Sequence, residues 1–165
     1  RRLMATTEFS VAIADIKNYV PDIEDYGLLD SNNDFDAPLQ QAENDVIRQI
    51  REEWWERYRH TVRYKDITKV TTLELDSSKL TNSQWTRSVV YRAWAEYIYP
   101  ILTKWKDPQG GDGQDAFQVQ MAHYRTKYAE EFNAVLRDGV EYDEDGDSNV
   151  TASEKEPIHH LRLVR

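Results

Sequence analysis

Cysteine is absent from the 165 residues of this chain. Disulfides, thiolate metal sites and cysteine nucleophiles are therefore all excluded. No apolar run approaches the roughly 18–20 residues that a membrane-spanning helix requires, and residues 1–7 lack the apolar core of a signal peptide. We therefore expect a soluble protein that does not associate with membranes.

Positive charge is also scarce, because 30 Asp and Glu residues face 21 Lys and Arg residues and give a formal net charge of -9. This balance argues against an open basic surface that wraps nucleic acid. The acidity is concentrated in residues 141–157, where seven acidic residues accompany a single lysine, Lys155. The rest of the chain is close to neutral, so the excess charge marks one segment of the protein.

Aromatic residues, in contrast, are plentiful enough for a core, with five Trp and ten Tyr in a length typical of one domain. In three segments the apolar residues recur at spacings of three and four, which is the pattern of an amphipathic helix. These segments cover residues 39–58, 85–105 and 117–136. We predict a mainly α fold, a small bundle of three to four helices that occupies residues 8–140.

Capping and helix-breaking residues give the expected ends of these helices. Asp36 is expected to act as the N-cap of the first long helix, which we predict to end near His60. Pro100 falls inside the second helix and cannot donate a backbone hydrogen bond, so we expect a bend or a break at residues 97–100. Gly139 is expected to end the third helix in a left-handed conformation.

Two segments are predicted to be extended. Polar and apolar residues alternate between Ile67 and Asp76, which favours a short extended arm at residues 61–80. Residues 141–165 are expected to form a second unit, an acidic loop followed by an extended C-terminal tail.

Two adjacent tryptophans, Trp54 and Trp55, lie on the first long helix. Neighbouring side chains on a helix diverge by about 100°, so these two are not expected to face the same core. Tryptophan is enriched in protein interfaces. We therefore expect one of this pair, or Trp85 or Trp105, to lie in a contact between subunits.

Residues 143–154 match the twelve-position calcium loop of EF-hands. Oxygen ligands fall at positions one, three, five, seven, nine and twelve, which are Asp143, Asp145, Asp147, Asn149, Thr151 and Glu154. Position six is normally glycine but here is Ser148, and a residue other than glycine at positive φ costs about 1 kcal/mol. Two interpretations stay open: a site for calcium or another divalent cation, or a solvated acidic loop without metal.

The one basic stretch consists of Arg57, Arg59, Arg63, Lys65 and Lys69, interleaved with Tyr58 and Tyr64. It suits contacts with phosphates, or a polar helix end or intersubunit patch that matches the acidic loops, and we favour the latter. No glycine-rich phosphate loop follows a strand, and no spacing defines a nucleophile, a histidine and an acid as a set. The sequence therefore predicts no enzyme, and His60 and His123 are expected on helix surfaces.

The order and character of these helices resemble the adaptor (head-completion, neck) proteins of tailed bacteriophages over most of residues 8–165. The residues that carry the resemblance are Asp15-Ile16-Lys17-Asn18-Tyr19-Val20-Pro21, then Ala42-x-x-x-Val46-Ile47-x-x-Ile50, then Leu80-Thr81-x-x-Gln84-x-x-Arg87-x-Val89-Val90-Tyr91-x-Ala93-x-x-x-Tyr97-Ile98-Tyr99-Pro100, and Tyr124-Arg125-x-x-Tyr128-x-x-Glu131-Phe132. The Asp-x-Asp-x-Asp segment and a short basic and apolar C-terminus complete the pattern.

This resemblance implies a structural subunit of the virion without enzymatic activity. Such adaptors form a ring, usually of twelve copies, which binds the portal protein and the next neck or tail protein and extends the channel for double-stranded DNA. It further implies assembly in the host cytoplasm and a location at the head–tail junction. The residues expected to dock on the portal are His159, His160, Leu161, Arg162, Leu163, Val164 and Arg165, with the 61–80 arm as the next contact. The alternative is a small calcium-binding regulatory or interaction module.

Overall fold

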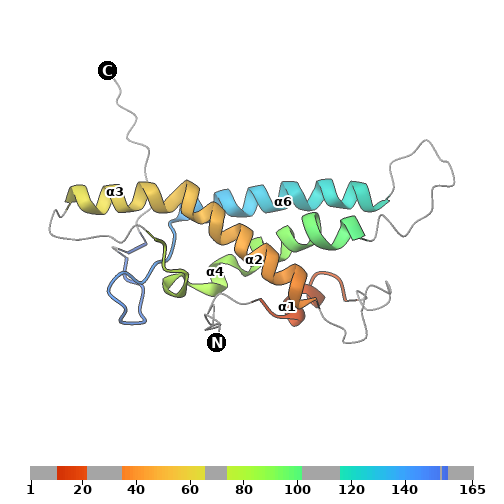
Figure 1. Cartoon of the computed structure of the whole chain (residues 1–165), viewed down its shortest axis with the longest axis horizontal. Helices are drawn as coiled ribbons and strands as arrows, with labels where there is room; N and C mark the ends of the chain where they lie inside the picture. The colour runs from red at the N-terminus through yellow and green to blue at the C-terminus, as the bar shows by residue number, and fades with distance from the viewer. Residues whose placement is uncertain (1–10, 22–34, 66–73, 102–115, 153, 156–165) are drawn as a thin grey trace, which may run out of the picture.

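The computed structural model describes residues 11–21, 35–65, 74–101, 116–152 and 154–155, and within them it is mainly helical (Figure 1). The elements in chain order are α1 (Ile13–Lys17), α2 (Asp36–Ile50), the π-helical turn η2 (Arg51–Trp55), α3 (Glu56–Lys65), the 3₁₀ turn η3 (Ser77–Lys79), α4 (Asn82–Ala93), the π-helical turn η4 (Trp94–Ile98) and α6 (Ala116–Asp138). The predicted small helical bundle is confirmed. In the described part of the chain, no helix is both long and apolar enough to cross a bilayer.

Helix α4 forms the centre of the bundle, because it packs against α2 on one side and α6 on the other. Its side chains Trp85, Val89 and Val90 have no exposed surface. Trp85 contacts Phe132 of α6 with the ring centroids 5.4 Å apart. The stripe that the sequence predicts for this helix is therefore the core of the molecule.

The N-terminal segment is attached to this core by apolar and polar contacts. Ile16 of α1 is fully buried, and the backbone N–H of Val11 donates a hydrogen bond to Glu43 of α2 at 2.7 Å. Burial raises the pKa of Glu43 above its ordinary value, although the hydrogen bond from Val11 opposes the shift. This buried carboxylate fixes where the chain first meets the bundle.

Helix α2 begins one residue before the predicted place. Phe35 holds the N-cap position, and Asp36 is the first helical residue, so the expected cap at Asp36 is wrong. Phe35 is 4% exposed, and the burial of its ring fixes the start of the helix in place of a side-chain cap. Asp36 still lies in the first turn, where a negative charge interacts favourably with the helix dipole.

The first long helix also continues past its predicted end. α2, η2 and α3 follow one another without interruption from Asp36 to Lys65, so the predicted end near His60 is wrong and residues 61–65 are helical (Figure 1). Each further residue adds one hydrogen bond to an existing helix, and Thr and Val reduce helix stability by less than about 1 kcal/mol each. The rest of the predicted arm lies partly outside the described residues, and η3 occupies residues 77–79.

Pro100 neither ends nor breaks its helix, because residues 99–101 remain helical. The π-helical turn η4 comes directly before them, and the N–H of Tyr99 donates to the carbonyl of Trp94, five residues earlier. A proline inside an α-helix presses its ring against the carbonyl four residues before it. The wider π-helical turn of η4 relieves that clash. The helix accommodates Pro100 in this way, by a turn with more residues.

Trp54 and Trp55 are both buried, each with 3% of its surface exposed, which contradicts the prediction that they face different environments. The segment after α6 brings Tyr142 against both indoles, with centroids 5.6 and 5.3 Å from its ring. Trp85 is buried as well, and Trp105 lies outside the described residues. A returning piece of chain thus covers the second tryptophan, where we expected a neighbouring subunit.

Gly139 ends α6 as predicted, with a φ of 100° and its N–H donating to the carbonyl of Val135 at 3.0 Å. A Cβ at this position would lie 2.1 Å from the carbonyl oxygen of Lys155. Gly146 also has a positive φ, 78°, but a Cβ there would meet nothing within 4 Å. Both glycines therefore need a left-handed backbone, but only Gly139 lacks room for a side chain.

Gly139→Ala should destabilise the protein by about 3 kcal/mol, because it adds a steric clash to the strain of a left-handed residue. Gly146→Ala is the matched control and should cost about 1 kcal/mol, since it introduces the strain alone. Urea unfolding followed by tryptophan fluorescence measures both values. Equal losses for the two variants would show that Lys155 does not pack on Gly139 in solution.

Candidate functional site

The acidic loop leaves the bundle at Gly139 and returns to it at Lys155. Lys155 pairs with Glu141 at 2.6 Å. Between them, Tyr142 forms a single antiparallel bridge with Leu80, just before α4. The N–H of Asp143 donates to the carbonyl of Lys79 at 2.9 Å. The beginning of the loop is therefore anchored on the turn that precedes the central helix.

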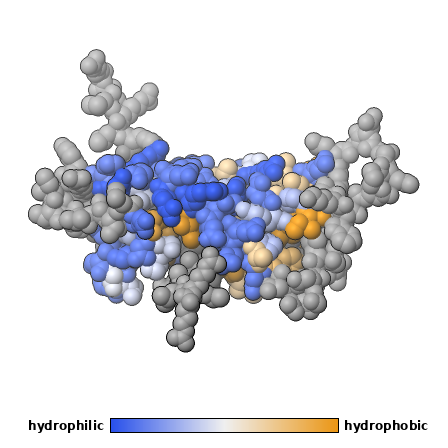
Figure 2. Space-filling model, viewed as in Figure 1, coloured by the Kyte–Doolittle hydropathy of each residue, from blue (hydrophilic) through white to orange (hydrophobic). Residues whose placement is uncertain are grey.

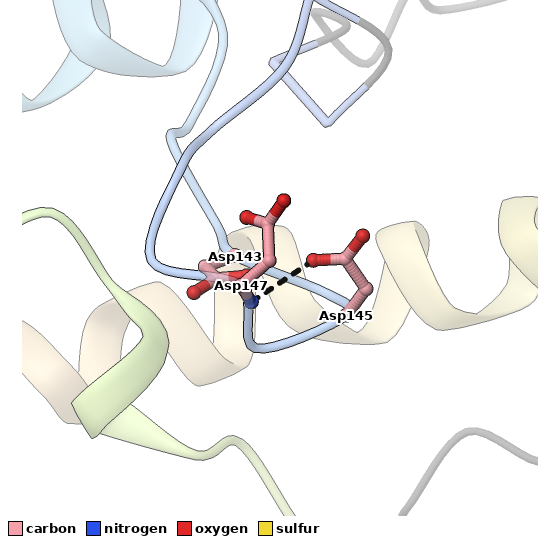
Figure 3. Close-up of side chains that lie close together, drawn as sticks. All are labelled: Asp143, Asp145 and Asp147. Carbon is pink, nitrogen blue, oxygen red and sulfur yellow. Dashed lines mark hydrogen bonds between the residues drawn. The ribbon is translucent and has the colours of Figure 1, made fainter.

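Three aspartates gather at the outer part of this loop (Figure 3). Carboxylate oxygens of Asp143, Asp145 and Asp147 all lie within 4.8 Å of one another. The backbone arranges them, because Asp143 accepts hydrogen bonds from the N–H groups of Gly146 at 2.7 Å and Ser148 at 2.8 Å. These three side chains form a cluster that could hold a metal ion.

Ser148 adopts the conformation that the calcium-loop pattern demands at its sixth position. Its φ is 66°, the only positive value outside glycine in the described part of the chain. The strain of about 1 kcal/mol is offset by the hydrogen bond from its N–H to Asp143. The loop therefore makes the sharp turn that normally falls to glycine.

Glu154, the predicted ligand at position twelve, points to the loop backbone and lies outside the aspartate cluster. One carboxylate oxygen accepts from the N–H of Glu144 at 2.9 Å, and the other accepts from the N–H of Thr151 at 2.8 Å and its hydroxyl at 2.7 Å. The N–H of Asn149 donates to Asp147 at 2.8 Å. The structure thus brings three of the six predicted ligands together, while Glu154 closes the loop.

The charges of the loop are stabilised unevenly. Loss of solvent raises the pKa of Asp143, but hydrogen bonds from the N–H groups of Ser148 and Gly146 outweigh it and leave the pKa below its ordinary value. For Asp145, the hydrogen bond from Asp147 lowers the pKa, yet reduced solvation and the charge of Asp147 leave it raised. Within the described residues, none of the three aspartates is recorded in an ion pair with Lys or Arg.

Tyr58 links the loop to the long helix, a contact that the sequence patterns do not reveal. Its hydroxyl donates to Glu144 at 3.0 Å, across 86 residues of sequence. Its ring stacks on Trp54 at 4.6 Å and meets Tyr142 at 5.8 Å. Burial raises the pKa of Tyr142 to about 12, so this side chain stays neutral at physiological pH. Periodicity identifies Tyr58 as a core residue but gives no sign of its partner.

The other predicted functional residues are dispersed or not described. The predicted docking residues from His159 to Arg165 lie outside the described residues, as does Lys69. His60 and His123 are exposed on α3 and α6, as expected. On the basic stretch, Arg57 is exposed and Arg59 pairs with Glu56 of the same helix.

Acidification should open the loop through Glu154. Hydrogen bonds from the N–H and hydroxyl of Thr151 lower the pKa of Glu154 below 4.5 in the folded protein. The ionised Glu154 therefore stabilises the fold fully above pH 4.5, and this stabilisation is lost as the pH falls through the lowered pKa. Glu154→Gln keeps a single acceptor oxygen, so it should be less stable at pH 7 and lose less stability between pH 5 and pH 3. Melting temperatures measured between pH 3 and pH 5 check this prediction, and Glu52→Gln at an exposed position is the control. The prediction is contradicted if the melting temperatures of Glu154→Gln and of the unmutated chain fall in parallel with pH.

Comparison of the chain with protein-family models, with curated proteins and with solved structures found no match.

Proposed function

We propose that this protein is a non-enzymatic structural subunit, an adaptor that forms a ring between the portal and the neck or tail of a tailed bacteriophage. In this role it lies at the head–tail junction of the virion, and double-stranded DNA passes through the ring without sequence-specific contacts. The observation that carries the proposal is the arrangement of the residues on which the adaptor resemblance rests.

Those residues are the packing residues of the bundle. On α2, Ala42, Val46 and Ile50 are fully buried. On α4 and α6 the corresponding side chains include Val89, Val90 and Phe132, each at most 1% exposed. The similarity to the adaptor pattern therefore concerns the residues that determine the helix packing. This supports a common architecture more strongly than a similarity of surface residues does.

The test of this role is assembly. Native mass spectrometry and negative-stain electron microscopy should find a closed ring of about twelve copies, either for the protein alone or after a portal ring is added. A chain that remains monomeric at all concentrations, with and without portal, would contradict the adaptor role.

A second proposal is that the acidic loop binds calcium. Two features support it: the clustered carboxylates of Asp143, Asp145 and Asp147, and the left-handed turn at Ser148 where calcium loops carry glycine. Calcium takes six to eight oxygen ligands, so water would complete the shell unless Glu154 turns toward the ion. The two proposals are compatible, because a cation would order the segment from which the C-terminal tail emerges.

Calcium should raise the melting temperature of the unmutated protein, and the double variant Asp145→Asn with Asp147→Asn should lose this shift. Asparagine keeps the acceptors for the N–H groups of Asp147 and Asn149. The metal-free melting temperature should therefore stay the same or rise as charge repulsion falls. Magnesium at the same concentration is the comparison ion. No calcium-induced shift in the unmutated protein would refute the proposal.

A further inference from the structure

Residues 11–20, which we call the N-terminal strap, form a short element that packs on two helices of the bundle. At one end, the backbone N–H of Val11 donates to Glu43 of α2 at 2.7 Å. At the other end, the ring of Tyr19 lies with its centroid 5.5 Å from that of Tyr91 on α4. Figure 1 shows the strap, in red, beside the beginning of α2. We call the surface that it covers, with Glu43 on α2 and Tyr91 on α4, the strap site.

The strap is a separate element, because few contacts hold it and α2 does not depend on it. Of the strap side chains that the structure describes, Val11 and Ile16 are the buried ones. The start of α2 is fixed by the burial of Phe35, which belongs to the helix itself. Elements with few buried apolar contacts open at a lower free energy than the core of a domain. The strap can therefore leave its site while the bundle stays folded.

Glu43 gives the strap site a specific acceptor for a chain segment. Its side chain is 8% exposed, and among the described residues no Lys or Arg pairs with it. A buried carboxylate without a cation lowers stability, and an apolar residue in its place would not. Buried polar groups of this kind can fix a partner in one register. Glu43 does so by accepting the main-chain N–H of the strap, so the site recognises a segment by its backbone as well as by its apolar side chains.

The rest of the described surface offers little apolar area through which copies could assemble. Among the described residues, the exposed large hydrophobic side chains are Tyr19, Ile101 and Val119, and Tyr19 belongs to the strap. The face shown in Figure 2 is mostly hydrophilic, with hydrophobic residues in small separate areas. Stable subunit interfaces contain an apolar core. In a ring, the strap is the element that can supply apolar contacts between copies, because its apolar side chains already have a matching site.

We infer that the strap of one copy lies on the strap site of the next copy in the ring, so that neighbouring subunits exchange this segment. A second copy fits the site by construction, because the contacts are the same whichever chain supplies the strap. The connecting residues 22–34 span at most about 43 Å when fully extended. Helices packed about 8–10 Å apart place equivalent points of neighbouring three-helix bundles about 20–30 Å apart, within this reach. This inference rests on the proposed ring and names one of its contacts.

Cross-linking in mixed rings tests the exchange, and a chain without native cysteine suits this test. Tyr19→Cys and Tyr91→Cys are made as separate chains, mixed in urea, returned to buffer with portal to assemble, and treated with a short bismaleimide. Exchange brings the two thiols together between unlike chains, so a covalent pair should appear on a denaturing gel. Glu96→Cys mixed with Arg125→Cys is the matched control. These two side chains meet within one chain at 2.9 Å, so the control mixture should give no covalent pair.

A second variant tests whether the strap holds copies together. Ile16→Asp should detach the strap and lower the association constant of the ring at least about tenfold, because the burial of one isoleucine contributes more than this factor. Ala14→Asp places the same charge at an exposed position of the same helix and should assemble like the unmutated chain. Sedimentation velocity measures assembly, and circular dichroism confirms that each variant is folded.

Two results would overturn the exchange while the ring remains. One is a ring of the two cysteine variants without covalent pairs, and the other is normal assembly of folded Ile16→Asp. If the unmutated chain forms no ring with or without portal, the proposed function fails, and the exchange of straps fails with it.

Discussion

The burial of α4 between α2 and α6 is the constraint on which the rest of this structure depends. Trp85, Val89 and Trp94 have no exposed surface, and a buried tryptophan alone removes on the order of 200 Å² from water. Because the helix is covered on two sides, the other helices take their positions from it. Asp45 attaches α2 to α4 and η4, since it accepts hydrogen bonds from Arg92 at 3.1 Å and from Tyr97 at 2.6 Å.

The segment after α6 depends on the same centre. Gly139 turns the chain back, and the side-chain amide of Gln84 on α4 donates to the carbonyl of Gly139 at 2.8 Å and accepts from the N–H of Glu141 at 2.9 Å. This places Tyr142 over the two adjacent tryptophans. The acidic loop is therefore held by the core of the bundle, although Asp145 and Asp147 are exposed to water. A loop held in this way can form a cluster of aspartates without a metal to gather them.

The sequence predicted those parts of the fold that depend on local periodicity. The apolar stripes of α2, α4 and α6 and the end of α6 at Gly139 follow from residue types at fixed spacings, whereas the sequence pattern marks Ser148 only as a departure from the calcium loop. The errors have two causes. Trp54 and Trp55 share a core because Tyr142, far along the chain, returns to cover them, and no local pattern contains that contact. Glu154 is a local error, because its carboxylate bonds to the backbone of Glu144 and Thr151 within the loop, where the spacing alone suggests a metal ligand.

The distribution of charge connects the fold with the proposed cation site. Among the described residues of the bundle, the half-buried Asp45 pairs with Arg92, and the buried Glu43 accepts from the backbone N–H of Val11. Because opposite charges that lie close together cancel at a distance, these pairs add little to the electrostatic potential around the bundle. The outer part of the acidic loop differs, because the carboxylate of Asp143 accepts hydrogen bonds from the backbone N–H groups of Gly146 and Ser148. An N–H group orients a carboxylate without neutralising it, so the loop keeps its net charge while it keeps its shape. That combination is what the proposed cation requires, since the ion then binds a preorganised set of acceptors and the chain loses little further conformational entropy.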